Sequence, residues 1–266
     1  MVFPLSILLL FLVCFLATLP GLKQYLWFIA QGYGLSIFAE GLIMIIMFHG
    51  RLTTGTTLCC LALMAYGLRL FSFLIYRTRR VKSYAQSMKG EIKSNNLVAP
   101  KVKIAIWVSC ILLYVCMVSP VYYRLHNDTG SDIFTYLGFL VMLSGLVLEA
   151  LSDLQKNAAK KKNPNKPVTT GLYVIVRCPN YLGELIIWSG VLISGLRSLS
   201  GLQWLVAFLG YAGIVYIMFG GARRLEVRQN KRYGNDPAYQ EYAKTVPILI
   251  PGLPLYSLEK YTWLKG

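Results

Sequence analysis

Charged residues are scarce in this sequence, and acidic residues are the scarcest. Only 14% of the 266 residues are charged while 56% are hydrophobic, and 27 Lys and Arg residues stand against 11 Asp and Glu. A soluble domain usually carries about 25% charged residues. One water-soluble core cannot hide this much apolar surface, so we expect lipid to cover the excess.

Histidine is nearly absent, and the cysteines do not form metal-binding pairs. The chain has two histidines and six cysteines, without a CxxC spacing. This pattern predicts neither a disulfide framework nor a metal site. A complete dinucleotide-binding fingerprint is also missing, because Gly32-Tyr-Gly34 lacks its third glycine and lies in an apolar run. A soluble dinucleotide-binding fold is therefore excluded.

Long apolar runs are what the sequence does have. A membrane-spanning helix needs about 20 mainly apolar residues. Runs near this length lie at about 2–19, 25–48, 53–76, 103–123, 133–152, 181–196 and 202–221. We expect an all-α, multi-pass transmembrane bundle of about seven spans. It would lie in the endoplasmic reticulum of a eukaryote or the inner membrane of a bacterium.

The basic residues lie between the apolar runs and predict an orientation. Connections on one side hold 23 of the 27 Lys and Arg residues. Cytoplasmic connections carry such an excess, so the N-terminus is expected outside and the C-terminus in the cytosol. This distribution argues against nucleic acid as a partner and for contact with membrane lipids. No obligate protein partner is predicted.

A polar stripe ends the fifth apolar run. Glu149, Asp153, Lys156 and Lys160 are spaced i, i+4, i+7 and i+11, so they share one face if this stretch is helical. One interpretation is a set of salt bridges at a helix end. However, Glu149 lies too far inside the run for simple solvation.

A second polar group surrounds the start of the sixth run. Arg177 precedes Pro179, and Asn180 and Glu184 follow at an i, i+4 spacing. Amide and carboxylate groups can bind an amide or a ribose hydroxyl, whereas Arg177 and the loop lysines can face phosphate. Together with the stripe, these residues predict a site for an anionic nucleotide.

Three polar residues interrupt the second and third runs. Tyr66 and Arg69 are spaced i, i+3, and Glu40 lies in the run before them. An arginine near the middle of a span costs roughly 2.5–3.5 kcal/mol, so Arg69 needs a carboxylate or a ligand phosphate. One interpretation is a Glu40–Arg69 ion pair. The other makes Tyr66 and a neutral Glu40 hydrogen-bond donors to a substrate oxygen.

The second half of the chain resembles the steroid 5-alpha-reductase-like membrane reductases. The resemblance covers roughly 130–255, and it thins to Tyr66-x-x-Arg69 and a glutamate in the second run before that. The matching pieces are Asp153-Leu-Gln-Lys156, Gly171-Leu-Tyr, Arg177-x-Pro-Asn180-Tyr-x-Gly-Glu184, and Glu241-Tyr242 with Ile250-Pro251. Isoprenylcysteine carboxyl methyltransferases look similar at the Pro-Asn-Tyr-x-Gly-Glu piece alone.

The resemblance implies a single membrane domain that binds NADPH from the cytosolic side. Residues 1–130 would form the substrate side and 131–266 the cofactor side. Cofactor ligands would come from Asp153, Lys160, Asn180, Glu184 and Tyr242, with Glu149 beside them and one or more of Arg223, Arg224 and Arg228. Cys178 stands where the family usually has histidine, and Glu149 and Lys160 replace amide and arginine types.

The implied reaction is reduction of a C=C bond conjugated to a ketone in a lipophilic, steroid-like substrate. Hydride from NADPH goes to the beta carbon while Tyr66 and Glu40 polarise the carbonyl. One alternative is a membrane methyltransferase that uses S-adenosylmethionine. Another is a sterol- or lipid-binding membrane protein without catalytic activity.

Overall fold

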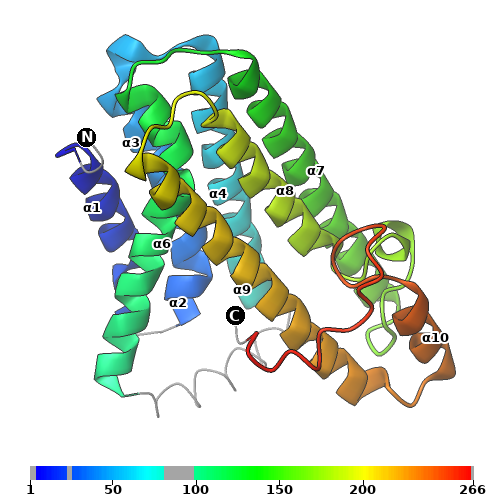
Figure 1. Ribbon diagram of the computed structural model, residues 1–266. Helices are drawn as coiled ribbons and strands as arrows, with labels where there is room; N and C mark the ends of the chain where they lie inside the picture. Colours follow the sequence, from blue (N-terminus) through cyan, green and yellow to red (C-terminus); the bar gives the residue numbers. More distant parts are fainter. Residues whose placement is uncertain (1–3, 23–25, 81–98, 265–266) are drawn as a thin grey trace. The chain divides into compact units, whose positions relative to one another are not determined.

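The computed structural model describes residues 4–22, 26–80 and 99–264. Its secondary structure is helical, at 77% helix, with no strand in these ranges. The main helices are drawn in Figure 1; their bounds are α1 Ile7–Thr18, α2 Leu26–Ile29, α3 Gln31–Met47, α4 Thr54–Arg80, α6 Pro100–His126, α7 Ile133–Lys162, α8 Pro179–Ser194, α9 Leu202–Tyr233 and α10 Pro237–Thr245. The prediction of an all-α protein is confirmed.

Each apolar run predicted to be a span contains a helix. Four helices, α4, α6, α7 and α9, are long and apolar enough to cross a membrane. Helices α1 and α3 are apolar but shorter, and α8 has 16 residues. These lengths and compositions indicate a membrane protein. The predicted basic connection after the third span falls largely on residues 81–98, outside the described residues.

The chain divides into two compact units. The first comprises Met1–Phe139 and Val191–Tyr211, and the second comprises Leu140–Gly190 and Ala212–Gly266. The division into a substrate side and a cofactor side near residue 130, which the resemblance implies, stays a prediction. Residues 191–211, by contrast, group with the N-terminal part.

In the first unit, α3 packs closely on α4 because glycines remove side chains at their contact. A Cβ atom on Gly67 would lie 2.5 Å from the amide nitrogen of Phe38 and 3.0 Å from its Cα. A Cβ on Gly41 would lie 2.9 Å from the carbonyl oxygen of Cys60. Small residues of this kind let helix backbones approach in a lipid environment.

Helix α6 continues through Pro120 because a neighbouring side chain replaces the lost hydrogen bond. Proline has no amide proton, so it leaves the carbonyl of Cys116 without its usual partner. The Ser119 hydroxyl donates to that carbonyl at 2.7 Å. The helix therefore keeps its polar groups satisfied within an apolar segment.

Buried Arg124 ties together the connections that follow α6 and α8. Its guanidinium donates to the carbonyl oxygens of Ser194 and Leu196, each at 2.5 Å, and of Gly130 at 2.8 Å. It also lies 3.1 Å from a carboxylate oxygen of Asp132. All these contacts lie within the first unit.

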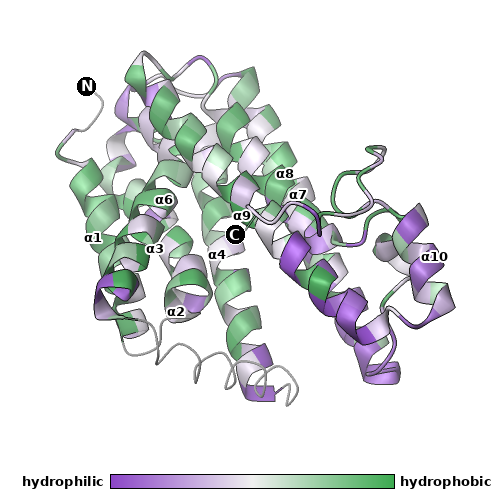
Figure 2. Ribbon diagram, turned by 60° about the horizontal axis from the view of Figure 1, so that its bottom comes forward, coloured by the Kyte–Doolittle hydropathy of each residue, from purple (hydrophilic) through white to green (hydrophobic). Residues whose placement is uncertain are grey.

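In the second unit, helix α9 extends well beyond its apolar part. Figure 2 shows the last turns of α9 as mainly hydrophilic. Asp236 then caps α10 by accepting a hydrogen bond from the amide of Ala238 at 3.0 Å, with Pro237 as the first helical residue. An aspartate followed by proline is a typical sequence signal for such a helix start.

Candidate functional site

The α7–α8 contact in the second unit is set by two glycines. A Cβ on Gly183 would lie 2.8 Å from the carbonyl oxygen of Gly145 and 2.8 Å from the amide nitrogen of Glu149. Asn180 and Glu184 flank Gly183 on α8, so this close contact places their turn of helix against the turn of α7 that carries Glu149. The predicted polar groups of α7 and α8 therefore come together.

The polar stripe lies on one continuous helix, as the spacing predicts, because α7 extends to Lys162. Glu149 is 4% exposed and Asp153 is 7% exposed. Lys156 is half-buried and close enough to the Cys178 thiol to affect its ionisation. These three residues run from the α7–α8 contact toward the loop before α8.

Lys160, the last residue of the stripe, contacts the protein's own polar groups. Its ammonium donates to the carbonyl oxygen of Lys166 at 2.5 Å and to the hydroxyl of Tyr233 at 2.8 Å. It also lies 5.2 Å from the centre of the Tyr233 ring. These contacts hold the loop after α7 against the end of α9.

On α8, one buried polar atom is left without a partner. The side-chain oxygen of Asn180 is inaccessible to solvent and accepts no hydrogen bond within the described part of the chain. Burying such a group without a partner costs about 1–3 kcal/mol. Glu184, one turn further, is 7% exposed. The Asn180 amide is therefore a candidate ligand-binding group.

The arginines of α9 interact with two different parts of the second unit. Arg224 and Arg228, spaced i, i+4, lie close enough to Tyr181 of α8 to interact with it electrostatically, as does Glu184. Arg223 instead donates to the carbonyl oxygen of Glu259 at 3.1 Å. Of the three arginines considered from the sequence, Arg224 and Arg228 thus belong to the polar group around α8.

Arg177 is buried in an ion pair. Its guanidinium lies 3.0 Å from a carboxylate oxygen of Glu226, and the two side chains are 2% and 3% exposed. It also donates to the carbonyl oxygen of Tyr256, and the other Glu226 oxygen accepts from the amide of Leu258 at 2.7 Å. The pair therefore fastens the C-terminal segment to α9.

Tyr242 lies on α10 and donates its hydroxyl proton to the carbonyl oxygen of Tyr173 at 2.7 Å. Burial, followed by the nearby Cys178 thiol, raises the pKa of Tyr242 above its ordinary value. The Tyr242 hydroxyl is therefore neutral, and it donates its proton to a carbonyl group of the protein itself.

In the first unit, Tyr66 is 1% exposed and bonded to a second tyrosine. Its hydroxyl donates to the hydroxyl of Tyr33 on α3 at 2.9 Å. The ring of Tyr33 also stacks on Tyr114 of α6, with the centroids 5.0 Å apart. Tyr66 is therefore held by an aromatic cluster drawn from three helices.

Glu40 is fully buried in the same unit. Neither of its carboxylate oxygens has a hydrogen-bond partner among the residues described, and the Ser36 hydroxyl one turn earlier has none either. The Cys14 thiol lies beside both. The Arg69 guanidinium lies over Phe73, 5.5 Å from the ring centre. The Glu40–Arg69 ion pair considered from the sequence is not formed.

Sequence reasoning missed Tyr33 and Glu226 as partners of predicted site residues. Tyr33 is 33 residues from Tyr66, and Glu226 is 49 residues from Arg177. No local spacing connects residues this far apart. The glycines at 34 and 41 on α3 gave a partial signal, because their seven-residue spacing marks one close-packed face.

Comparisons with known proteins identify a family. A family model described as "Protein of unknown function (DUF1295)" matches residues 21–246. A protein named "Probable O-methyltransferase ustE" from Ustilaginoidea virens is 29% identical over 101 residues, which cover 37% of this chain and 36% of that relative. The chain thus matches little more than a third of that relative's length. No solved structure matches the chain at a significant level.

Proposed function

We propose that this chain, which belongs to the DUF1295 family, is a membrane reductase that uses NADPH to reduce a C=C bond conjugated to a ketone. The family is related to steroid 5-alpha-reductase-like membrane proteins. The proposal includes a seven-span arrangement with the N-terminus outside and the C-terminus in the cytosol. Its substrate is a lipophilic enone such as a 3-oxo steroid, which can enter from the bilayer.

The observation that carries the proposal is the buried, unpartnered side-chain oxygen of Asn180. An amide oxygen in this position can accept a hydrogen bond from a carboxamide or a ribose hydroxyl. Glu184 lies one turn away, and Arg224 and Arg228 lie near the intervening Tyr181. Carboxylate, amide and guanidinium groups together match a dinucleotide, which has hydroxyls, an amide and phosphates.

The residues on α7 extend this match. Asp153 is buried. It directly follows Ser152, whose carbonyl oxygen accepts a hydrogen bond from the Tyr173 hydroxyl at 3.3 Å. Lys156 adds a positive charge near Cys178. NADPH, when bound, supplies the hydride. Arg177 and Lys160 support the surrounding loops through their own contacts, and Arg223 supports the C-terminal segment.

The substrate chemistry in this proposal belongs to Tyr66 and Glu40. As hydride reaches the beta carbon, negative charge would develop on the carbonyl oxygen, and a proton from water added at the alpha carbon would complete the reduction. With substrate bound, the Tyr66 hydroxyl would turn its proton from Tyr33 to that oxygen and accept a hydrogen bond from the Tyr33 hydroxyl in return. A neutral Glu40 carboxyl would donate a second hydrogen bond. A preorganised donor in a water-excluded site can be worth about 3–4 kcal/mol.

A second candidate is a methyltransferase that uses S-adenosylmethionine. The relative named as a probable O-methyltransferase favours it, over 101 residues at 29% identity. The carboxylates near α8 would also suit the hydroxyl and amino groups of that cofactor. The arginines on α9 favour the phosphate-bearing NADPH.

One assay separates these functions. Purified protein in detergent is mixed with NADPH and a panel of lipophilic enones, and the absorbance of the reduced cofactor is followed. The reductase proposal expects oxidation of NADPH that depends on the enone. Transfer of a labelled methyl group from S-adenosylmethionine without NADPH oxidation would favour the second candidate. Tight lipid binding with neither reaction would indicate a binding protein and overturn both.

A further inference from the structure

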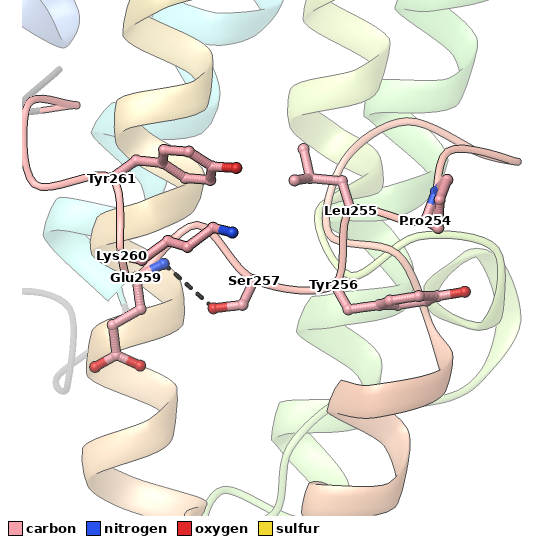
Figure 3. Close-up of a pocket in the computed structure, with 7 residues that line it drawn as sticks. All are labelled: Pro254, Leu255, Tyr256, Ser257, Glu259, Lys260 and Tyr261. Atoms are coloured by element: carbon pink, nitrogen blue, oxygen red, sulfur yellow. Dashed lines mark hydrogen bonds between the residues drawn. The ribbon is translucent and has the colours of Figure 1, made fainter.

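We propose that the C-terminal segment binds an anionic membrane phospholipid in a hollow lined by residues 254–261. The hollow has a volume of about 650 Å³ and is open to the surface; its lining residues, drawn in Figure 3, are Pro254, Leu255, Tyr256, Ser257, Glu259, Lys260 and Tyr261. None of these residues takes part in the proposed reductase chemistry, so this inference stands independently of it.

Contacts with α9 place the hollow along that helix. The hydroxyl of Tyr216 donates to the carbonyl oxygen of Trp263 at 2.9 Å, and the two rings stack with centroids 6.2 Å apart. Arg223 reaches the carbonyl oxygen of Glu259, two helical turns further along α9. The segment therefore runs antiparallel to α9 from its basic part back toward its apolar part.

This position matches the boundary between hydrocarbon and headgroups. The apolar run of α9 ends near residue 221, and the charged part begins at Arg223. Because α9 is long and apolar enough to cross a membrane, lipid phosphates are expected near this change of polarity. Trp and Tyr side chains are enriched at that level of membrane proteins.

The charges at the hollow favour an anion. Lys260 is exposed, and its ammonium lies 5.1 Å from the centre of the Tyr261 ring, with its side chain between Tyr261 and Ser257 in Figure 3. The neighbouring Glu259 carboxylate points away in the same view and accepts a hydrogen bond from Asn230 at 3.0 Å. Although Glu259 is one of the lining residues, its carboxylate is directed away from the Lys260 ammonium, which can therefore meet a phosphate at the edge of the Tyr261 ring.

Apolar groups beside this charge favour a lipid over a soluble anion. Leu255 and Tyr261 extend toward each other across the hollow in Figure 3. Nearby, Trp263 is 61% exposed and Leu253 is 50% exposed. A phospholipid satisfies both features, because its phosphate can bind Lys260 while its acyl chains cover these side chains.

The test measures lipid binding to the whole purified chain by native mass spectrometry. Phosphatidylglycerol is titrated into the wild-type protein and into Lys260→Gln, Lys260→Arg and the control Lys244→Gln, which removes an exposed lysine on α10 outside the hollow. Phosphatidylcholine and glycerol 1-phosphate serve as the zwitterionic lipid and the soluble headgroup. Circular dichroism checks that each variant is folded.

We expect Lys260→Gln to weaken phosphatidylglycerol binding about fivefold, as loss of one interfacial positive charge predicts. Lys260→Arg and Lys244→Gln should bind as the wild type does, and phosphatidylcholine should bind less tightly. Equal affinity of Lys260→Gln and the wild type would overturn the proposal, as would an equal loss in Lys260→Arg. Displacement of the lipid by millimolar glycerol 1-phosphate would show a site for small soluble anions instead.

Discussion

The hydroxyl of Tyr66 donates a hydrogen bond to the hydroxyl of Tyr33, with 2.9 Å between the oxygen atoms. Their rings pack edge to face, with centroids 6.0 Å apart. The contact joins α3 to α4 and fixes the position of the Tyr66 hydroxyl. In the proposed reaction, Tyr33 is therefore a positioning residue, and Tyr66 donates a hydrogen bond to the substrate oxygen once its proton turns away from Tyr33.

Tyr66→Phe should reduce turnover of an enone by about 10²–10³-fold, the usual cost of removing one donor to a developing oxyanion. Its affinity for NADPH should stay unchanged. Tyr33→Phe keeps the Tyr66 hydroxyl and should lower kcat less. Steady-state kinetics and cofactor titration measure both effects. Full kcat in Tyr66→Phe would show that this hydroxyl is not the donor.

Asn180→Ala should weaken NADPH binding about tenfold, because the buried amide oxygen would lose a hydrogen bond worth roughly 1.4 kcal/mol. Asp153→Ala should weaken it as well. Asn235→Ala, at an exposed position before α10, is the matched control and should bind normally. Fluorescence of the bound cofactor gives the affinities. If both site variants bind NADPH as the wild type does, the proposed cofactor site is wrong.

Glu226→Ala should destabilise the protein by about 3–5 kcal/mol, because it leaves the Arg177 guanidinium buried without its carboxylate. The amide of Leu258 also loses its acceptor, so the C-terminal segment should become more accessible to protease. Thermal unfolding in detergent and limited proteolysis measure these changes. Exposed Glu241→Ala is the control.

Replacing both partners distinguishes the stability contributed by the ion pair from the cost of leaving one charge buried without a partner. The double variant Arg177→Met, Glu226→Leu removes both charges and should recover much of the stability lost in Glu226→Ala. A melting temperature for Glu226→Ala equal to that of the wild type would contradict the role assigned to this pair.

Gly67→Ala should destabilise the first unit by about 1–3 kcal/mol, because the new Cβ would meet the backbone of Phe38 at 2.5 Å. Backbone atoms cannot move aside as a flexible side chain can. Gly50→Ala is the control, since a Cβ there has no atom within 4 Å. Thermal unfolding compares the two, and equal stability would show that the α3–α4 contact tolerates a methyl group.

Cys178 should react slowly with alkylating agents near neutral pH. Burial raises the pKa of its thiol from 9.0 to about 11, although the charges of Lys156 and Arg177 act in the opposite direction. Because the thiolate is the reactive form, native protein should be alkylated about a hundredfold more slowly than unfolded protein between pH 7 and 8. Peptide mass spectrometry measures the rates, and equal rates would contradict the burial.

The same shift predicts how pH affects stability. The folded state favours the neutral thiol, so the contribution of Cys178 to stability is complete below pH 9.0, its ordinary pKa. The contribution is lost as pH rises through about 11. A comparison of unfolding curves for the wild type and Cys178→Ser at pH 8 and pH 11 tests this sign.

The sequence by itself determined the helices and their local faces. Long apolar runs require helices because no water in lipid can satisfy the backbone. The spacing of Glu149, Asp153 and Lys156 placed them on one face of α7, and Asp236-Pro237 marked the start of α10. These features depend on residues within a few turns, so local patterns are enough to reveal them.

Only the tertiary structure decided which distant groups meet. It pairs Arg177 with Glu226 and Tyr66 with Tyr33. It also gives Arg223 a different partner from those of Arg224 and Arg228. Such contacts depend on how whole helices approach one another, and close packing at Gly145 and Gly183 controls that approach for α7 and α8. Helical periodicity gives the direction of a side chain on its own helix, but the partner that it reaches is set by the packing of the chain.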